Sequence, residues 1–400
     1  MRIKPTILVL ASTFPRWKND TEPRFVYDLS LRLKDKFHII ILAPHCVKSK
    51  TKEELDGLEV VRYRYAPERF ESLAYEGGIT AKLKTNKFNW FLLPFFFLGQ
   101  WIAIVRIIKK HPVKVIHAHW LIPQGILALM ARLISKNKPK ILCTSHGGDL
   151  YSLNDPISKV IKRYVIRNVD ALTVVSTAMQ QEIKKLVQQT SLPEVAPMGT
   201  NLKRLFTPDD TVQRNPNLLL FVGRLVEKKG LKYLLRALPE VIKKYPNIIL
   251  NIVGTGPEQK SLKQQITRLN LDNYVRFLGR LSHEELVGQY RQAYISVFPF
   301  IEADNGDKEG LGLVMIEAMG CGCPVIASDI PAVRDVIFDG KTGGFVEAGN
   351  SKELQEKIIM WLGREDICQT ISAKALQVVR RKFDWKSVST QYETILQTLI

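Results

Sequence analysis

The stretch EGLGLVMIE places two carboxylates, Glu309 and Glu317, at the ends of a run of glycine and apolar residues. Gly310 and Gly312 allow the backbone to approach a ligand closely. A helix expected to begin at Leu313 would point its free amides and positive dipole end at that ligand. A diphosphate would bind to these amides, Glu309 would reach the group beyond the phosphates, and Glu317 would accept hydrogen bonds from a ribose diol.

The alternative for this stretch is structural. Glu309 would then be a helix-capping acid and Glu317 an exposed acid on the helix surface. The apolar neighbours of Glu317 in LVMIEAMG disfavour an exposed position for this residue.

A second glycine-bearing segment, FVGRLVEKKG, carries two cations at an expected strand-to-helix turn. Arg224 follows Gly223 at the strand end, and Lys229 lies five residues later, just before Gly230. Two cations so placed can converge on a dianionic group such as a diphosphate. An ordinary solvated loop is the alternative.

Two nucleotide-binding motifs of other kinds are incomplete. IVGTGPE holds a Gly-x-Gly at a strand end but lacks the third glycine of a dinucleotide fingerprint. DVIFDGKTG ends like a Walker A loop, but Asp335 stands where the first glycine is required. ATP hydrolysis of the P-loop kind is therefore disfavoured.

The segment TSHGGDL places His146 at the end of an expected buried strand, followed by two glycines and Asp149. The glycines leave space around the ring, which favours a functional histidine over one that is only hydrogen-bonded in the core. His117 and His119 in IHAHW are interpreted as structural or acceptor-side residues, because a metal site would need a third ligand that the sequence does not offer.

The composition is globular and strongly basic. The net charge is +19, and residues 1–200 hold 31 Lys and Arg against 16 Asp and Glu. Such a positive field suits a polyanionic partner, which could be an anionic membrane surface, nucleic acid or an acidic substrate.

The five cysteines are scattered, and the chain begins without a signal-peptide pattern, so a reducing cytoplasm is expected.

The longest apolar run, WFLLPFFFLGQWIAIV, covers residues 90–105 and is interrupted by Pro94, Gly99 and Gln100. It is shorter than the roughly 20 apolar residues of a membrane-spanning helix. We expect either a buried helix or a helix that dips into a membrane face, the latter favoured by the basic flanks and the Trp and Phe content.

Short apolar runs alternate with helical patterns along the whole chain, as buried parallel strands and their crossover helices do. The alternation restarts after the polar segment FTPDDTVQRNPN. The predicted fold is α/β, with two doubly wound Rossmann-like domains facing each other across a cleft. The domains are expected at 1–203 and 204–380, with a C-terminal helix at 381–400 that could pack back on the first domain.

Together these motifs resemble the family 4 retaining glycosyltransferases of the GT-B fold, and the likeness covers nearly the whole chain. Glu309 and Glu317 match the two-acid signature of that family. GRLVEKKG resembles its phosphate-binding loop, MGTNLKRLFTP its interdomain link, and HGGD its cleft histidine loop.

The resemblance implies a nucleotide-diphosphate sugar donor bound mainly by the second domain. Arg224 and Lys229 would hold the diphosphate, and backbone near Arg280 and Leu281 the base, with UDP favoured over GDP. In the first domain, His146 would face the transferred sugar and the acceptor. No cofactor and no metal are expected, because the cations and helix amides would stabilise the departing diphosphate.

The chain also departs from the family pattern. The segment STFPRWKNDTEPRFVYDL stands where many members have a glycine-rich loop, and Asp20 and Thr21 are the residues that could approach the same space. Leu311 replaces the usual aromatic residue between the two glycines, and EADNGDK is a longer, acidic lead-in. These departures leave room for a different sugar specificity.

The basic first domain predicts a lipid-linked or polysaccharide acceptor and a peripheral location on the cytoplasmic face of the plasma membrane. No nucleic-acid partner is expected, because the basic residues are dispersed and form no recognisable motif. The alternatives are a nucleotide-sugar hydrolase or epimerase on the same fold, and a basic nucleic-acid or membrane-binding protein without catalysis. An NAD-dependent oxidoreductase is weakened by the incomplete fingerprint.

Overall fold

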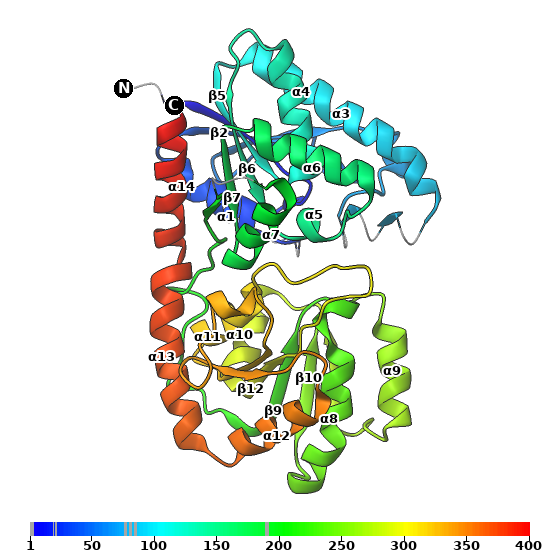
Figure 1. The fold of residues 1–400 in the computed structure, drawn as a ribbon, viewed down its shortest axis with the longest axis vertical. Coiled ribbons are helices and arrows are strands. Elements are labelled where there is room, and N and C mark those ends of the chain that lie inside the picture. The colour runs from blue at the N-terminus through cyan, green and yellow to red at the C-terminus, as the bar shows by residue number, and fades with distance from the viewer. Residues whose placement is uncertain are drawn as a thin grey trace. The chain divides into compact units, whose positions relative to one another are not determined.

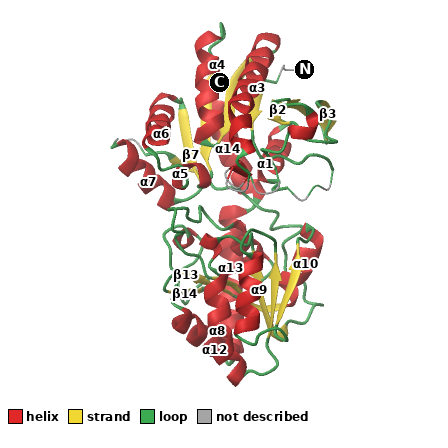
Figure 2. Cartoon of the chain, turned by 90° about the vertical axis from the view of Figure 1, so that its right-hand side faces the viewer, coloured by secondary structure: helices red, strands yellow, loops and turns green. Residues whose placement is uncertain are grey.

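The computed structural model describes residues 4–18, 20, 22–75, 78–79, 82–83, 86–188 and 192–400. The chain divides into two compact units. Unit 1 comprises Met1–Val175, Met179–Ala196 and Ser389–Ile400, and unit 2 comprises Ser176–Ala178 and Pro197–Val388. Each unit is a sheet covered by helices, so the predicted α/β fold with two Rossmann-like domains is confirmed (Figures 1 and 2).

Unit 1 contains an eight-stranded sheet in the order β3-β4-β2-β1-β5-β6-β7-β8. All neighbouring strands are parallel except the hairpin pair β3 and β4. The strands are β1 (Thr6–Leu10), β2 (His38–Pro44), β3 (Lys52–Leu55), β4 (Leu58–Tyr63), β5 (Val113–His119), β6 (Lys140–Ser145), β7 (Ala171–Val174) and β8 (Glu194–Val195).

The chain reverses its direction of strand addition between β1 and β5, so this is the point of unit 1 where a doubly wound sheet offers a binding crevice. The helices that cover the sheet or follow its strands are α1 (Phe25–Leu33), α3 (Phe88–Lys110), α4 (Ile126–Ile134), α5 (Gly148–Tyr151), α6 (Pro156–Asn168) and α7 (Thr177–Val187). A short π-helical turn, Leu121–Gly125, links β5 to α4.

The apolar run at 90–105 lies within α3, a helix of 23 residues that continues through Pro94. In the part of the chain that the structure describes, it is the one helix long and apolar enough to cross a membrane by length and composition, and one third of its most apolar window is buried. Leu92, Phe96 and Ile104 lie in the core, while Phe91 and Phe95 are exposed. The helix therefore buries one face and leaves an apolar face uncovered.

Unit 2 contains a fully parallel six-stranded sheet in the order β11-β10-β9-β12-β13-β14. Its switch point lies between β9 and β12. The strands are β9 (Asn215–Val222), β10 (Ile249–Val253), β11 (Val275–Gly279), β12 (Ala293–Phe298), β13 (Val325–Ser328) and β14 (Gly344–Val346). The helices are α8 (Leu231–Lys244), α9 (Gln259–Arg268), α10 (His283–Gln292), α11 (Leu313–Gly320), α12 (Ser351–Leu362) and α13 (Glu365–Phe383).

The core of unit 2 is formed by aliphatic residues of the strands packed against α8, α9, α12 and α13. Helix α8 contributes Leu234, Leu238 and Val241, which recur at intervals of about one helical turn and are completely buried. The packed core fixes the positions of the strand ends, where the loops that carry the predicted site residues begin.

The C-terminal helix α14 (Trp385–Leu399) begins in unit 2 and ends in unit 1. In unit 2, the Trp385 ring packs so closely on Gly199 that a Cβ at this glycine would lie 2.6 Å from it. In unit 1, the buried Tyr392 donates its hydroxyl to the carbonyl of Ala196 at 2.9 Å. The boundary between units at 196 and 197 lies close to the one predicted at 203 and 204.

Candidate active site

Helix α11 begins at Leu313, as the sequence predicted, and ends at Gly320. Gly312 caps it in the left-handed conformation with φ of 84°. The backbone conformation favours glycine at this position, and a Cβ there would also lie 2.8 Å from Met315 Cε, the end of a flexible side chain. The helix therefore presents its first amides next to Gly310, at the strand-end side of unit 2.

Glu309 is paired with Lys229, whose Nζ lies 2.8 Å from Glu309 Oε2. Both side chains are largely buried. Burial opposes ionisation of the acid, but the charges of Lys229 and Lys228 outweigh it and lower the pKa of Glu309 to about 2. The two residues, predicted separately as the sugar and diphosphate ligands, are thus adjacent in the structure.

A second cation, Lys228, fixes the acidic lead-in to Glu309. Its Nζ lies 3.0 Å from Asp307 Oδ1 and donates to the carbonyl of Lys308 at 3.0 Å. The amide of Ile301 donates to the Lys228 carbonyl at 2.9 Å. The loop after β9 and the loop after β12 are therefore joined by hydrogen bonds to backbone carbonyls and by ion pairs. Sequence reasoning missed Lys228 and Asp307, although the Lys-Lys doublet was a visible signal.

Glycines allow the loops after β9, β10 and β12 to pack on one another. A Cβ at Gly230 would lie 1.7 Å from the Pro299 carbonyl oxygen, and one at Gly254 would lie 2.0 Å from that of Gly223. A Cβ at Gly256 would lie 2.3 Å from the Leu225 carbonyl oxygen. The Gly-x-Gly of IVGTGPE thus serves backbone packing against the cationic loop.

The remaining predicted donor residues lie on the same group of loops. Arg224 is exposed beside Gly223. Arg280 follows β11 and donates from Nε to Thr255 Oγ1 at 3.0 Å, and Leu281 is partly buried next to it. Because Gly254 N donates to the Gly279 carbonyl at 2.6 Å, the loops carrying Thr255 and Arg280 are directly connected.

Glu317 is partly buried on α11 and accepts a hydrogen bond from the Tyr290 hydroxyl at 3.2 Å. Burial raises the pKa of Glu317 to about 8, and the bond from Tyr290 opposes that rise. Tyr290, a fully buried residue of α10, was not recognised from the sequence. Its contact with Glu317 shows that the acid is held in place by the core.

In unit 1, His146 lies in an aromatic enclosure after β6. Its ring centroid lies 4.8 Å from that of Phe25, 5.0 Å from Trp120 and 5.2 Å from His119. Burial and the neighbouring His117 lower the pKa of His146 to about 3, so the ring is neutral at physiological pH.

Asp149 holds the backbone around His146. Its carboxylate accepts from Leu121 N at 2.7 Å, Ser145 Oγ at 2.9 Å and His146 N at 3.2 Å. Burial raises the pKa of Asp149, although the three hydrogen bonds favour the ionised form and oppose this rise. Both oxygens are engaged by protein donors, so the geometry gives Asp149 an anchoring role, and a direct bond to substrate stays a prediction.

Two further expectations concern the loop after β1. Asp20 is buried and accepts from the backbone amide and the guanidinium of Arg16, with all three contacts at 2.8 Å. It therefore orders this loop. Thr21 lies outside the described residues.

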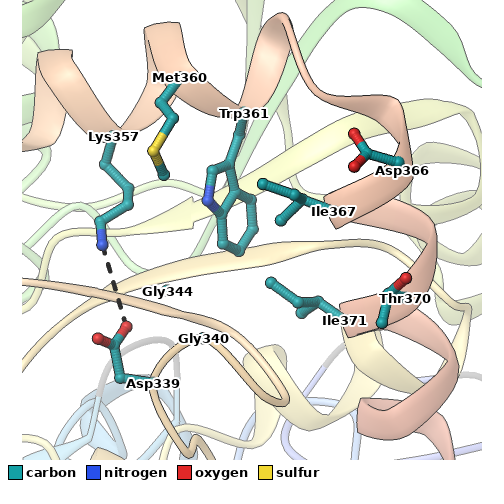
Figure 3. Close-up of a pocket in the computed structure, with 10 residues that line it drawn as sticks. All are labelled: Asp339, Gly340, Gly344, Lys357, Met360, Trp361, Asp366, Ile367, Thr370 and Ile371. Carbon is teal, nitrogen blue, oxygen red and sulfur yellow. Dashed lines mark ion pairs between the residues drawn. The ribbon is translucent and has the colours of Figure 1, made fainter.

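A pocket of about 330 Å³ lies elsewhere in unit 2, between α12, α13 and the segment before β14 (Figure 3). None of the predicted donor residues lines it, and we assign it no role. The residues that line the pocket are Asp339, Gly340, Gly344, Lys357, Met360, Trp361, Asp366, Ile367, Thr370 and Ile371.

Among the described residues, no group of three or more His, Cys, Asp and Glu side chains is arranged to hold a metal ion.

Comparison with known proteins gives the family. Residues 23–204 match the model described as Glycosyltransferase Family 4, and residues 206–378 match Glycosyl transferases group 1. The chain is 24% identical to N-acetyl-alpha-D-glucosaminyl L-malate synthase of Bacillus anthracis, over 78% of this chain and 82% of that protein. It is 28% identical to a GDP-mannose-dependent monoacylated alpha-(1-6)-phosphatidylinositol monomannoside mannosyltransferase of Corynebacterium glutamicum, over 74% of this chain and 79% of the relative.

The fold is that of solved glycosyltransferases. The structure of Anabaena HepE in complex with UDP and glucose matches with a TM-score of 0.76 and 19% identity, over 98% of this chain and 100% of that one. Two Rossmann-like units, family models that together span most of the sequence, and matching relatives lead to one conclusion: the chain is a glycosyltransferase of the GT-B fold and belongs to glycosyltransferase family 4.

Proposed function

We propose that this glycosyltransferase transfers a sugar, with retention of anomeric configuration and without an obligatory metal, from a nucleotide-diphosphate sugar to a lipid-linked or polysaccharide acceptor at the cytoplasmic membrane face. The observation that carries the proposal is the arrangement in unit 2. There the N-terminus of α11, the ion pair of Lys229 with Glu309, and Glu317 lie on connected loops and one short helix.

Each part of the donor has a complementary group in this arrangement. The α11 amides, Arg224 and Lys229 would bind the diphosphate, because amide donors and cations stabilise phosphate charge. Glu317 would accept hydrogen bonds from the ribose hydroxyls, and the backbone at Arg280 and Leu281 would contact the base.

The transfer itself needs no covalent bond to the protein. The acceptor hydroxyl oxygen forms the new bond to the anomeric carbon on the face from which the diphosphate leaves, and the departing phosphate oxygen takes the hydroxyl proton. Lys229 and the helix amides stabilise the negative charge that develops on the diphosphate. Glu309 would hold sugar hydroxyls, and His146 would contact the transferred sugar or the acceptor hydroxyl.

The base of the donor is proposed to be uracil, with guanine as the second choice. HepE was solved in complex with UDP and glucose, whereas the Corynebacterium relative is named for GDP-mannose. Family membership is compatible with both nucleotides, so the base must be determined by binding.

The acceptor side is proposed to be a membrane surface because of the uncovered face of α3. Phe88, Phe91, Phe95 and Leu98 recur at helical spacing and are exposed, and Trp90 is exposed beside them. The guanidinium of Arg69 lies 4.7 Å from the ring of Phe70, whose centroid is 6.0 Å from that of Phe88. An apolar stripe with a cation close by suits an interface rich in anionic lipid.

The donor proposal is tested by thermal shift and calorimetry of the full chain with UDP, GDP, ADP and their sugars. One nucleotide should stabilise the wild type and fail to stabilise Glu317→Ala and Arg224→Ala. Lys243→Ala is the matched control, because Lys243 is an exposed cation on α8 that pairs with Glu240, away from the loops of the site. A lack of response to every nucleotide would contradict the donor site.

The reaction class is tested by product analysis with the nucleotide sugar so identified. Proton NMR of the glycosylated acceptor should show the anomeric configuration of the donor. Inverted product would contradict retention. Free sugar as the dominant product in the presence of acceptor would favour a hydrolase, and an isomerised nucleotide sugar would favour an epimerase.

A further inference from the structure

Three histidines of unit 1 lie together at the switch point of its sheet. His117 and His119 are on β5, and both are buried almost completely. The ring of His119 lies 4.1 Å from that of His117 and 5.2 Å from that of His146, measured between centroids. The His119 and His146 rings are nearly parallel, at 18°.

His119 and His146 are joined by a hydrogen bond. His119 Nδ1 lies 2.9 Å from His146 Nε2. Burial is the main cause that lowers the pKa of both rings, and the low values keep both neutral. A neutral imidazole has one donor nitrogen and one acceptor nitrogen. The bond therefore gives His146 Nδ1 the role opposite to that of His146 Nε2, whichever ring carries the shared proton.

His117 and its neighbours restrict movement of the His119 ring against His146. His117 Nε2 lies 2.8 Å from Thr144 Oγ1, which lies 2.7 Å from Thr173 Oγ1. The Tyr392 ring stacks on His117 with centroids 5.6 Å apart. His119 thus cannot turn away from His146 without disturbing packed residues of β5, β6 and α14.

We propose that His119 is a positioning residue, which fixes the ring orientation and the tautomer of His146 and thereby sets whether His146 offers a donor or an acceptor to the substrate. The inference rests on the proposed role of His146 at the transferred sugar or the acceptor. His119 itself does not touch the substrate. This role differs from a catalytic one, because it should disappear when His146 is absent.

The first test is a set of variants of the full chain. In His119→Ala the bond is lost, and in His119→Asn the side-chain amide can replace Nδ1 as donor or acceptor. The readout is release of free sugar from the identified nucleotide sugar without acceptor. His119→Ala should lower kcat by about 10- to 100-fold, the size of loss seen when the partner that orients a metal-ligating histidine is removed, with KM for the donor nearly unchanged. His119→Asn should recover a large part of the loss.

A double-mutant cycle separates positioning from general damage. In a His146→Ala background, His119→Ala should cause little further loss, because its effect is transmitted through His146. His38→Ala is the matched control, since His38 is an exposed histidine of the same unit. An equal loss from His119→Ala in both backgrounds would overturn the proposal.

The second test does not require activity. Nitrogen-15 NMR of histidine-labelled protein distinguishes protonated from unprotonated ring nitrogens. His146 should show one tautomer from about pH 6 to pH 8 in the wild type, keep one tautomer in His119→Asn, and show a mixture in His119→Ala. Unchanged His146 signals in a folded His119→Ala protein would overturn the proposal. If no sugar nucleotide is turned over by the wild type, the proposed function fails, while this NMR result still decides whether His119 controls His146.

Discussion

Lys229 and Glu309 form an ion pair of 2.8 Å that joins the loop after β9 to the start of α11. The two residues are far apart in sequence, and the strand order of unit 2 brings them together because β9 and β12 are neighbours. The pair brings together the lysine proposed to bind the diphosphate and the acid proposed to bind the sugar. Variants of either residue should therefore affect both ligand binding and the local fold.

Replacing Lys229 with Met should weaken binding of the nucleotide diphosphate by about 10- to 100-fold, since a hydrogen bond to a charged group contributes about 1.5–3 kcal/mol. Isothermal titration calorimetry measures the loss, with Lys243→Met as the control. Wild-type affinity in Lys229→Met would contradict the assignment.

The same substitution should alter acid stability. The pKa of Glu309 lies at about 2, below its ordinary value of 4.5, so its stabilising effect is present above pH 4.5 and is lost as the pH falls toward 2. Without Lys229 this effect shrinks. Urea denaturation should therefore show the largest difference between wild type and Lys229→Met near neutral pH and a smaller one in acid; a difference that grows in acid would contradict the prediction.

Asp307→Asn should loosen the acidic lead-in by removing the charged partner of Lys228. Water still reaches both side chains and screens the pair, so the free energy of unfolding should fall by about 1 kcal/mol or less. Hydrogen exchange of the loop at 301–309 should increase. Glu302→Gln is the control, because its ion pair with Lys308 is exposed. Equal exchange in the two variants would show that the Lys228 contact does not order the loop.

Glu317→Gln should change the pH dependence of both stability and binding. Because the folded-state pKa of Glu317 is about 8, above its ordinary 4.5, stability present below pH 4.5 is lost as the pH rises through 8. The variant should gain stability relative to wild type over this range. Glu356→Gln, at an exposed site of α12, should show no such trend.

Binding should show the opposite trend for the same group. An ionised Glu317 is the better acceptor for two ribose hydroxyls, so wild-type affinity for the nucleotide diphosphate should rise from about pH 6 to pH 8 relative to that of Glu317→Gln. Calorimetry at several pH values measures this ratio. A ratio independent of pH would contradict ionisation of Glu317 in the complex.

Gly312→Ala should destabilise unit 2 by about 1–3 kcal/mol, because an alanine at φ of 84° is strained and its Cβ would contact Met315. Gly288→Ala is the control within the same unit. Gly288 lies inside α10 with open space around it, so alanine there should stabilise by about 0.5–1 kcal/mol. Thermal unfolding compares the two, and equal effects would contradict the structural role of Gly312.

The double variant Phe91→Ser, Phe95→Ser should lose binding to anionic vesicles by about 10-fold or more, since each buried aromatic side chain contributes about 1.5–3 kcal/mol. Vesicle sedimentation at low salt, with and without anionic lipid, measures the loss of binding. Phe338→Ser, Met360→Ser removes two exposed apolar residues from unit 2 and is the control. Equal vesicle binding by both double variants would contradict docking through α3.

The sequence by itself determined the fold class, the family and the local features of the proposed donor site. The expected alternation of apolar strands and helices is present in both units, because a strand buried on both faces needs a continuous apolar segment. The start of α11 was predictable because a glycine followed by an apolar helical pattern is a local signal. The sequence did not reveal the hairpin of β3 and β4, because β3 is Lys-Glu-Glu-Leu and lacks an apolar run. It also did not reveal β8 and β14, which are only two and three residues long.

The tertiary structure alone decided which residues are partners. It paired Lys229 with Glu309, Tyr290 with Glu317, and His119 with His146. It also showed that α3 continues through Pro94 and buries only one of its faces. These contacts join residues that are distant in sequence, and they depend on which strand ends lie side by side. Many Lys, Glu and His residues could have formed such pairs, and only the packed sheet selects among them.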